Sequence, residues 1–330
     1  MKNNSQIQNR CPVCENEKDI FYLDNYRLHI DEDIFFFNNI KLFKCNICET
    51  GFACPMPELE NLSEFYRNTY RSSDRPPWWT SKIYDNKYVS YLEDKNLSLL
   101  QYLTTFININ EIENIFDFGA GYGDLGFVLK KKKPSISLDC SENDKECEKI
   151  LIERGYNNFK NIEGTNSKYD LILAIHSLEH LTNTKIFINF KKLLKPKGLI
   201  FFEVPNSSQE YFRKRIYDSP HLIFFTKKSF EKIGLKYNLR LINITTSSYS
   251  MSDSFKFQKQ SQNLYKKLNN GIFKFKYIKN FIKRITPKIF LQFRRDYLKL
   301  KKINDDFRLN HFINNSYDSW CVRGIFQKND

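Results

Sequence analysis

The sequence has no long apolar run and no internal repeat. No stretch approaches the roughly 18 uninterrupted apolar residues that a membrane-spanning helix needs. The opening residues, MKNNSQIQNR, lack the apolar centre of a secretory signal. We therefore expect a cytoplasmic protein. A length of 330 residues with 41% apolar residues allows one large folded domain with additions, or two domains.

Acidic residues are scarce in the C-terminal part of the chain. Residues 251–310 contain 16 Lys and Arg but only 4 Asp and Glu, a net of +12 in a chain whose formal charge is +14. The remainder is therefore nearly neutral. A basic surface of this kind favours a polyanion, a phosphorylated substrate or an anionic membrane. The alternative is compositional drift in a chain rich in Lys, Asn, Ile and Phe.

Five of the eight cysteines lie in the first 60 residues, and four of them form two Cys-x-x-Cys pairs. In a cytoplasmic protein, cysteines indicate metal ligands or free thiols rather than disulfides. Cys11 with Cys14 and Cys45 with Cys48 complete a tetrahedral set of four thiolates, which leaves no open position and predicts a structural Zn²⁺. Cys54 could replace Cys48, although its spacing fits less well. We expect the remaining three to be small buried apolar residues: Cys140, Cys147 and Cys321.

From residue 114 onwards, short apolar runs alternate with helical stretches. Such alternation predicts a parallel, doubly wound sheet that is covered on both faces. The expected strands are 114–118, 135–139, 169–175, 198–204, 240–245 and 319–326, with a weaker one near 159–163. Ser141 and Thr226 are expected to cap helices that stop at Gly155 and Gly234. Before this region, the three- and four-residue spacing of apolar residues over 83–92 predicts a helix, after a linker at 75–77.

A glycine-rich segment, FDFGAGYG at 116–123, follows the first of these strands. Glycines at the end of a strand let the backbone turn tightly against a ligand. Asp139 lies 22 residues after Asp117, at the expected end of the next strand, where a carboxylate accepts hydrogen bonds from ribose hydroxyls. A nicotinamide-binding domain uses the same geometry. The acid before the glycines distinguishes the two, because a pyrophosphate gains nothing from an adjacent carboxylate.

Residues 114–206 resemble class I S-adenosylmethionine-dependent methyltransferases, particularly the group that modifies small molecules and sugars. The similar motifs are 116–123, Asp139, YDLILAIHSLEHL at 169–181 and LKPKGLIFFEVP at 194–205. The resemblance implies a Rossmann-like, seven-stranded methyltransferase fold, with Asp117 near the cationic aminoacid end of the methyl donor. Glu163 is the nearest candidate for the acid that meets the adenine. The implied residues that bind S-adenosylmethionine are Asp117, Gly119, Ala120, Gly121, Gly123, Asp139 and His176.

The N-terminal cysteine region is similar to the zinc-binding domain fused to some sugar C- and O-methyltransferases. In that group two cysteine pairs precede an aromatic segment, matched here by Phe65-Tyr66 and Tyr70. The module helps to build the substrate cleft in those enzymes. The resemblance thus implies that Tyr66 or Tyr70 touches the substrate, and the alternative is that both pack between modules.

Three of the five histidines are candidates for chemistry. His176 and His180 follow the strand at 169–175, at the sheet edge where ligands bind in such folds. His221 lies in SPHLIFFT at 219–226, which is similar to a segment of the same sugar methyltransferases. Methyl transfer to oxygen or carbon requires removal of a proton, which suits histidine. The resemblance implies His221 and His180 as catalytic residues, and the alternative for His180 is a structural role beside Glu179.

One departure from the group concerns the type of acceptor atom. C-methylating members carry Tyr-x-Glu-His at the second histidine, whereas this chain has Pro220 where the Glu would be and Tyr217 four residues before His221. We therefore favour O-methylation over C-methylation of a sugar, nucleotide-sugar or surface glycan. A phosphorylated or lipid-linked acceptor would suit the basic segment.

Two apolar stripes run through that segment, on either side of Pro287. Their members are Ile278, Phe281, Ile282 and Ile285, then Ile289, Phe290, Phe293, Tyr297 and Leu298. Basic amphipathic helices can lie on an anionic membrane, here through 271–302, or can cap an active site. We favour the cap. The expected regions are a zinc-binding module at 1–60, a helical linker at 61–110, the methyltransferase core at 111–250, a basic helical insertion at 251–315 and a final core strand at 316–330.

Two other functions compete with this prediction. RNA methylation is suggested by the charge and the zinc module, but no Asn-Pro-Pro-Tyr-type tetrapeptide follows Ile175 and the cysteine spacing is unlike that of RNA enzymes. We therefore do not expect nucleic acid as the partner. A catalytically silent scaffold is the other alternative, against which the intact Asp117, glycines and Asp139 argue.

Overall fold

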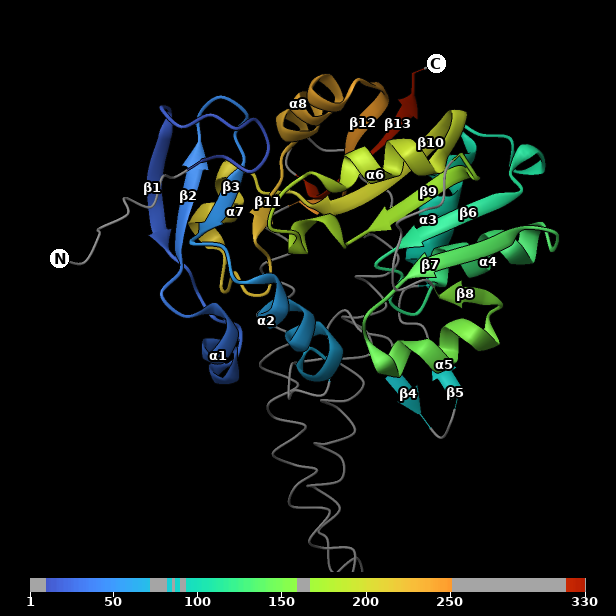
Figure 1. The fold of residues 1–330 in the computed structure, drawn as a ribbon, viewed down its shortest axis with the longest axis horizontal. Helices are drawn as coiled ribbons and strands as arrows, with labels where there is room; N and C mark the ends of the chain where they lie inside the picture. Colours follow the sequence, from blue (N-terminus) through green and yellow to red (C-terminus); the bar gives the residue numbers. More distant parts are fainter. Residues whose placement is uncertain are drawn as a thin grey trace, which may run out of the picture.

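The computed structural model describes residues 10–71, 82–84, 87–89, 93–158, 167–250 and 319–329. Two lobes face each other in Figure 1, with a small sheet on the left, a large sheet on the right and helix α2 between them. No helix in the described part is long and apolar enough to cross a membrane. The expected linker at 75–77, strand at 159–163 and basic insertion at 251–315 lie outside the described residues, as does Glu163.

The large sheet has seven strands in the order β12-β13-β10-β9-β6-β7-β8. Five neighbouring strands are parallel, and β13 lies antiparallel between β10 and β12. The chain order reverses between β6 and β9, and ligands bind at the carboxyl ends of such a pair. The strands are β6 (Asn114–Phe118), β7 (Ser137–Ser141), β8 (Tyr156–Asn158), β9 (Tyr169–Ile175), β10 (Leu194–Pro205), β12 (Leu239–Ser250) and β13 (Ser319–Lys328).

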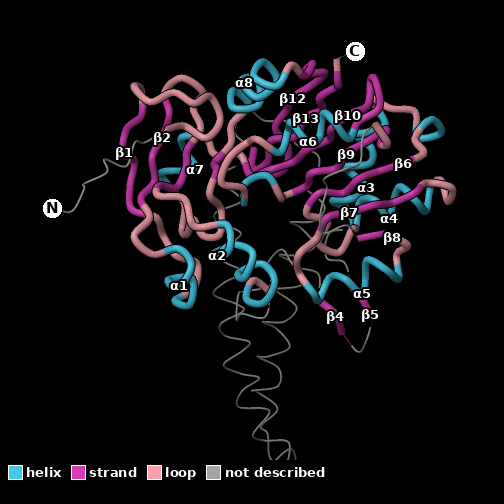
Figure 2. The backbone as a smooth tube through the Cα atoms, viewed as in Figure 1, coloured by secondary structure: helices cyan, strands magenta, loops and turns pink. Residues whose placement is uncertain are grey.

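Each face of this sheet carries its own apolar core. Helices α6 (Ile186–Leu193) and α8 (Lys227–Tyr237) cover one face, where the rings of Phe202 and Phe230 stack with centroids 3.9 Å apart. Helices α3 (Glu93–Thr104), α4 (Asp124–Lys132) and α5 (Lys145–Glu153) cover the other. Figure 2 shows α6 and α8 on one side of the magenta strands and α4 and α5 on the other. The predicted doubly wound α/β fold is therefore confirmed.

The small sheet belongs to the N-terminal lobe but takes one strand from later in the chain. Its order is β1-β2-β3-β11, formed by Ile20–Asn25, Lys41–Cys45, Gly51–Cys54 and Ile223–Phe224. Short helices surround it: α1 (Ile34–Phe37), α2 (Leu59–Glu64), which continues as a π-helical turn at Phe65–Thr69, and α7 (Gln209–Lys214). Because β11 begins two residues after His221, the pairing of β11 with β3 holds this histidine against the N-terminal lobe.

Three local predictions are wrong. Residues 82–84 and 87–89 form an antiparallel pair, β4 and β5, instead of part of a helix. Their Ile, Tyr and Val favour strands, and a few apolar residues can match a helical spacing by chance. Helix α5 is capped by Asp144, whose side chain accepts the Glu146 N–H, whereas Ser141 ends β7.

The third error concerns Gly234, which does not end helix α8. The helix continues to Tyr237 and ends at Asn238, which has a left-handed φ of 51°. A Cβ on Gly234 would lie 3.1 Å from the Leu239 carbonyl oxygen and 3.1 Å from the Phe326 ring. This glycine therefore serves close packing of the helix on the sheet. The stop at Gly155 is confirmed, since α5 ends at Glu153 and Gly155 has a φ of 76°.

Candidate active site

The glycine-rich segment forms a tight loop between β6 and α4. Gly119, Gly121 and Gly123 all have left-handed φ values, of 63°, 56° and 69°. A Cβ on Gly119 would lie 2.7 Å from the Cβ of Ser177. Glycine is thus required here by both backbone conformation and space. Ala120 follows Gly119, whose N–H donates to the Ser141 carbonyl oxygen at 2.8 Å and fixes the loop against the end of β7.

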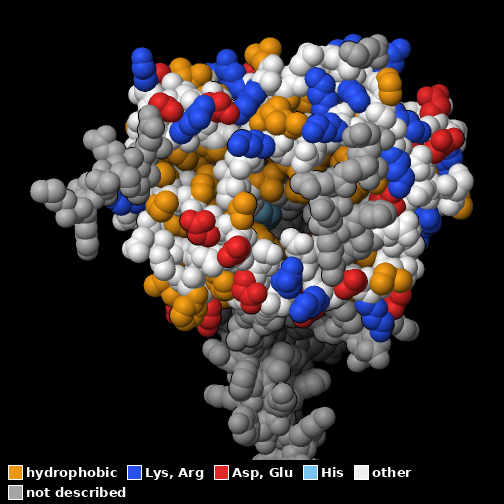
Figure 3. Space-filling view, in the orientation of Figure 1, with side chains coloured by type: hydrophobic (Ala, Val, Ile, Leu, Met, Phe, Trp, Pro, Cys, Tyr) orange, Lys and Arg blue, Asp and Glu red, His pale blue; other side chains and the backbone are white. Residues whose placement is uncertain are grey.

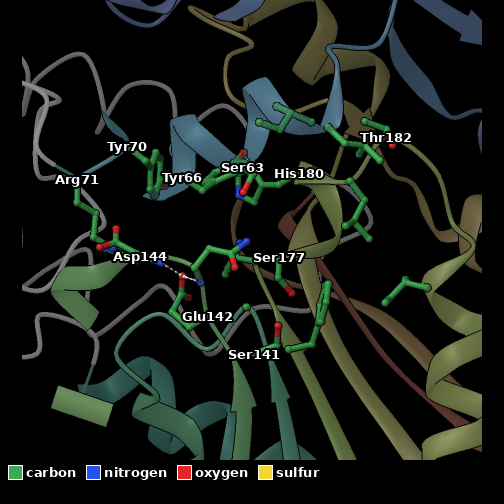
Figure 4. A pocket seen from close by; sticks show the side chains of 18 of the residues that line it. Ser63, Tyr66, Tyr70, Arg71, Ser141, Glu142, Asp144, Ser177, His180 and Thr182 are labelled. Carbon is green, nitrogen blue, oxygen red and sulfur yellow. Dashed lines mark hydrogen bonds and ion pairs between the residues drawn. The ribbon is translucent and has the colours of Figure 1, made fainter. Parts of the chain in front are cut away.

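A cavity of about 410 Å³ opens beside this loop. It lies at the carboxyl ends of β6, β7 and β9, and the helical segment 59–71 of the N-terminal lobe forms the opposite wall (Figure 4). Figure 3 shows a hollow between the lobes with hydrophobic side chains around it and a histidine visible inside. The lining residues include Leu59, Leu62, Ser63, Tyr66, Tyr70, Arg71, Phe118, Gly119, Ser141, Glu142, Asp144, His176, Ser177, His180, Thr182 and Asn183.

Asp117 lies behind the loop and not at the cavity surface. Its side chain is buried, and the Tyr156 hydroxyl donates to Oδ2 at 3.1 Å. The described lining residues do not include it. Burial raises the pKa of Asp117 to about 7 despite the hydrogen bond from Tyr156. The resemblance implies that Asp117 contacts the methyl donor. In this structure its carboxylate does not reach the described cavity lining.

Asp139 is also buried and is not among the described lining residues of the cavity, so its contact with a ribose stays a prediction. The side chain is 1% exposed and accepts hydrogen bonds from Tyr169 at 2.8 Å, from Asn157 at 3.0 Å and from Lys168. The physical reason is that β7 runs to Ser141, so Asp139 lies inside the sheet and not at its edge.

Glu142, directly after β7, occupies the edge position and lines the cavity. Its Oε2 accepts the Gly121 N–H at 2.6 Å, and its Oε1 accepts the Asn143 and Asp144 N–H groups at 2.8 and 2.9 Å. The sequence does contain a signal for this residue, namely an acid at the first position after an apolar strand. We missed it because the strand was predicted to end at Asp139.

His176 lines the cavity where β9 ends, with a left-handed φ of 53°. Its ring nitrogens lie 3.2 Å from Glu203 Oε1 and 3.4 Å from Glu179 Oε1. Glu203 is buried and paired with Arg323, whose guanidinium nitrogens lie 2.7 and 2.9 Å from Oε2. His176 therefore has a structural anchor in the sheet and one face toward the cavity.

The two other candidate histidines lie together, with ring centroids 5.0 Å apart. His180 lines the cavity, and its Nδ1 lies 2.9 Å from the Tyr66 hydroxyl. His221 is not among the described lining residues and lies against His180. Burial lowers the pKa of His180, and burial together with His180 lowers the pKa of His221 to about 3. Both rings are therefore neutral at physiological pH.

The four predicted cysteine ligands converge in the N-terminal lobe. Their sulfur atoms all lie within 4.8 Å of one another, with Cys11–Cys48 at 3.4 Å and Cys14–Cys45 at 3.6 Å. A Zn–S distance of about 2.3 Å requires sulfurs about 3.8 Å apart in a tetrahedron. The set therefore fits Zn²⁺ with little movement. No disulfide forms, and the other three cysteines predicted to be apolar core residues are buried: Cys140, Cys147 and Cys321.

This cysteine cluster is attached to the large lobe by hydrogen bonds. Thr184 beside α6 donates to the Pro12 carbonyl at 3.1 Å, and Lys236 of α8 donates to the Val13 carbonyl at 3.0 Å. Thr50, next to Cys48, donates to Ser229 of α8 at 2.8 Å. A metal held by the four thiolates would thus stabilise the attachment of the N-terminal lobe to the large lobe.

Comparison with known proteins adds independent evidence. Residues 88–244 match the model of a family described as a methyltransferase domain. Among the curated proteins no sequence matches. Similar solved structures include an S-adenosylmethionine-dependent methyltransferase from Archaeoglobus fulgidus, with 14% identity over 72% of this chain and 95% of the other and a TM-score of 0.44.

Two further structures show a similar degree of likeness. Phosphoethanolamine N-methyltransferase 2 from Haemonchus contortus has 15% identity over 85% of this chain and 63% of the other, with a TM-score of 0.47. A methyltransferase from Methanosarcina mazei has 12% identity over 69% and 97%, with a TM-score of 0.42. The match over 88–244, just under half of the chain, together with the strand order and the glycine loop, supports an enzyme that transfers methyl groups from S-adenosylmethionine.

Proposed function

We propose that the enzyme transfers a methyl group to a hydroxyl oxygen of a sugar, nucleotide-sugar or surface-glycan acceptor. The observation that carries this proposal is the position of His180, which faces the cavity from the end of β9 while Tyr66 of the N-terminal lobe holds its Nδ1 at 2.9 Å. A neutral imidazole thereby lies in the same cavity as the glycine loop, where an acceptor can lie between the two.

Binding of the methyl donor falls to the residues around the glycine loop. Glu142 is the acid that lies at the cavity edge, and we assign to it the role of accepting hydrogen bonds from the ribose hydroxyls. Arg71 closes the same end, with its Nε 2.9 Å from Asp144 Oδ2 and its guanidinium over the Tyr122 ring. When bound, S-adenosylmethionine supplies an electrophilic methyl group on a sulfonium.

The proton of the acceptor is taken by His180. In the tautomer with hydrogen on Nδ1, this nitrogen donates to the Tyr66 oxygen, and the Tyr66 hydroxyl donates to the Pro220 carbonyl at 3.4 Å. That chain leaves the Nε2 lone pair free to accept a proton. His180 Nε2 takes the hydroxyl proton while the oxygen forms a bond to the methyl carbon, and the electron pair of the broken C–S bond stays on sulfur. His221 supports the His180 ring from behind.

The acceptor class follows from the cavity wall. Tyr66, Tyr70 and Leu59 give it an apolar and aromatic side, whereas Ser63 and Asn183 add polar groups. A pocket that combines apolar surface with a few polar groups suits a polyhydroxylated ring, whose faces are apolar and whose edges are not. Pro220 in place of a glutamate supports oxygen over carbon as the acceptor atom.

Two predictions about partners concern the basic segment, which lies outside the described residues. Residues 251–310 would supply cations for a phosphorylated or lipid-linked acceptor, and residues 271–302 would make the contact with an anionic membrane. Both stay proposals that rest on the charge alone.

Transfer of labelled methyl groups into a fractionated cell extract tests the function. The fractions are RNA, small molecules, and envelope glycan with its lipid carriers. We expect label in the small-molecule or glycan fraction. Label confined to RNA would overturn the sugar assignment, and absence of label from every fraction would favour a silent scaffold.

A further inference from the structure

Three side chains of metal-ligand type meet next to the cavity. Glu179, His180 and His221 each offer one ligand atom, and these atoms all lie within 4.8 Å of one another. Glu179 and His180 belong to a turn of 3-10 helix after β9, whereas His221 comes from the segment that enters the N-terminal sheet. The cluster therefore depends on the packing of the two lobes and not on a local motif.

One of these side chains has an oxygen without a partner. Glu179 is 2% exposed, and within the described part of the chain its Oε2 makes no hydrogen bond. Its Oε1 lies 3.4 Å from His176 Nδ1. A buried carboxylate oxygen without a partner is costly, so such groups are paired or bind a metal. The oxygen of Glu179 is therefore a ligand that a cation would satisfy.

The donor set selects the class of cation. Two imidazoles and one carboxylate suit Zn²⁺ and its neighbours such as Co²⁺ and Mn²⁺, and a three-ligand site keeps a position open. Ligands about 2.1 Å from the metal lie about 3.4 Å apart in a tetrahedron. The three atoms would therefore need to approach by little more than about 1 Å.

A neighbouring group of similar composition differs because its carboxylate already has a positively charged partner. His176, Glu203 and Cys321 also lie within 4.8 Å of one another. There, however, the Arg323 guanidinium already lies 2.7 Å from Glu203 Oε2 and supplies the positive charge. Substitutions in that group therefore provide a matched control.

We propose that Glu179, His180 and His221 form a binding site for a divalent transition-metal ion, and that occupation of this site stops methyl transfer. The second part rests on the proposed function, because the imidazole lone pair of His180 that coordinates a metal can no longer take the proton of the acceptor. The binding itself does not rest on it.

Cobalt titration of the full-length, chelator-treated protein tests the binding. Co²⁺ bound to the four cysteines gives intense thiolate charge-transfer absorption together with its own d–d bands, whereas Co²⁺ on two imidazoles and a carboxylate adds d–d absorption without charge transfer. We expect both signals in the wild type. Glu179→Gln and His221→Gln should each weaken binding of the second cobalt ion, measured by the d–d absorption added after the thiolate bands are complete, at least about tenfold, and Cys321→Ser should keep both signals.

Three outcomes would overturn the inference. The first is a wild type that shows the thiolate signal alone. The second is Glu179→Gln and His221→Gln proteins that are folded by circular dichroism and bind both cobalt ions as the wild type does. The third is full methyl transfer with the d–d site saturated, which would remove the inhibitory role. If enzyme with metal on the four cysteines alone methylates no fraction, the proposed function fails and the inhibition with it, whereas the cobalt spectra still decide the metal site.

Discussion

The Tyr66 hydroxyl lies 2.9 Å from Nδ1 of His180 and joins the N-terminal lobe to the carboxyl edge of the large sheet. These residues are 114 positions apart in the chain. Tyr66 lies on the π-helical turn after α2, and its hydroxyl also reaches the Pro220 carbonyl beside His221. The Tyr66 hydroxyl thus contacts both the segment of His180 and the segment of His221. The N-terminal lobe is therefore part of the candidate active site.

Removal of this hydroxyl should slow methyl transfer without unfolding the protein. In Tyr66→Phe the His180 tautomer is no longer held, and loss of one hydrogen bond of about 1.4 kcal/mol corresponds to roughly a tenfold lower kcat. Steady-state kinetics and thermal melting would measure this. Tyr22→Phe removes a hydroxyl bond to Asn25 on the exposed strand β1 and should change neither quantity. A Tyr66→Phe enzyme with wild-type kcat would contradict the role of Tyr66.

Glu142 and Asp139 should respond in opposite ways to loss of charge. We expect Glu142→Gln to weaken binding of S-adenosylmethionine about tenfold with an unchanged melting temperature, because one charged acceptor to the ribose is lost. Asp139→Asn should lower stability by about 3 kcal/mol, since it breaks a buried network with Lys168 and Tyr169. Calorimetric titration and melting curves separate the two effects. Weaker donor binding in a stable Asp139→Asn protein would restore the sequence-based assignment.

Removal of metal from the cysteine cluster should loosen the N-terminal lobe. Cys11, Cys45 and Cys48 are buried in the same core as the residues of α6 and α8. Loss of one thiolate in Cys14→Ser should abolish the bound zinc and lower the melting temperature by at least about 5 °C, because binding of a structural metal contributes directly to folding. Elemental analysis and calorimetry would show this. Cys54→Ser, outside the cluster, should retain the zinc.

The apolar runs of the sequence were sufficient to predict most of the large sheet. Strands at 114–118 and 169–175 agree with β6 and β9 residue for residue, because a buried parallel strand is apolar along most of its length. The cysteine cluster followed from spacing alone, since each Cys-x-x-Cys pair places two thiolates on one turn. These features depend on residues that are close together in the chain.

The parts of the candidate site that the sequence did not predict depend on positions far apart or on a shift of two residues. Asp139 and Glu142 differ only in which of them lies beyond the end of β7, a boundary that local composition does not define. The contact of His221 with His180 requires β11 to join β3, a pairing between segments about 170 residues apart. No pattern within either segment reveals it, so the contact between the two histidines could not be predicted.

The buried carboxylate of Asp117 should make stability depend on pH. Burial raises the pKa of Asp117 to about 7, above its ordinary value of 3.8, so between these limits the folded state binds a proton that the unfolded state does not. Stability therefore falls as the pH rises through this window, by at most about 1.4 kcal/mol per pH unit. Asp117→Asn keeps an acceptor for the Tyr156 hydroxyl but cannot ionise. Urea unfolding should thus give similar stabilities for the two proteins at pH 4 and a more stable variant at pH 8. Equal stabilities at both pH values would mean that Asp117 stays ionised in the fold, with a counter-charge that the described residues do not supply.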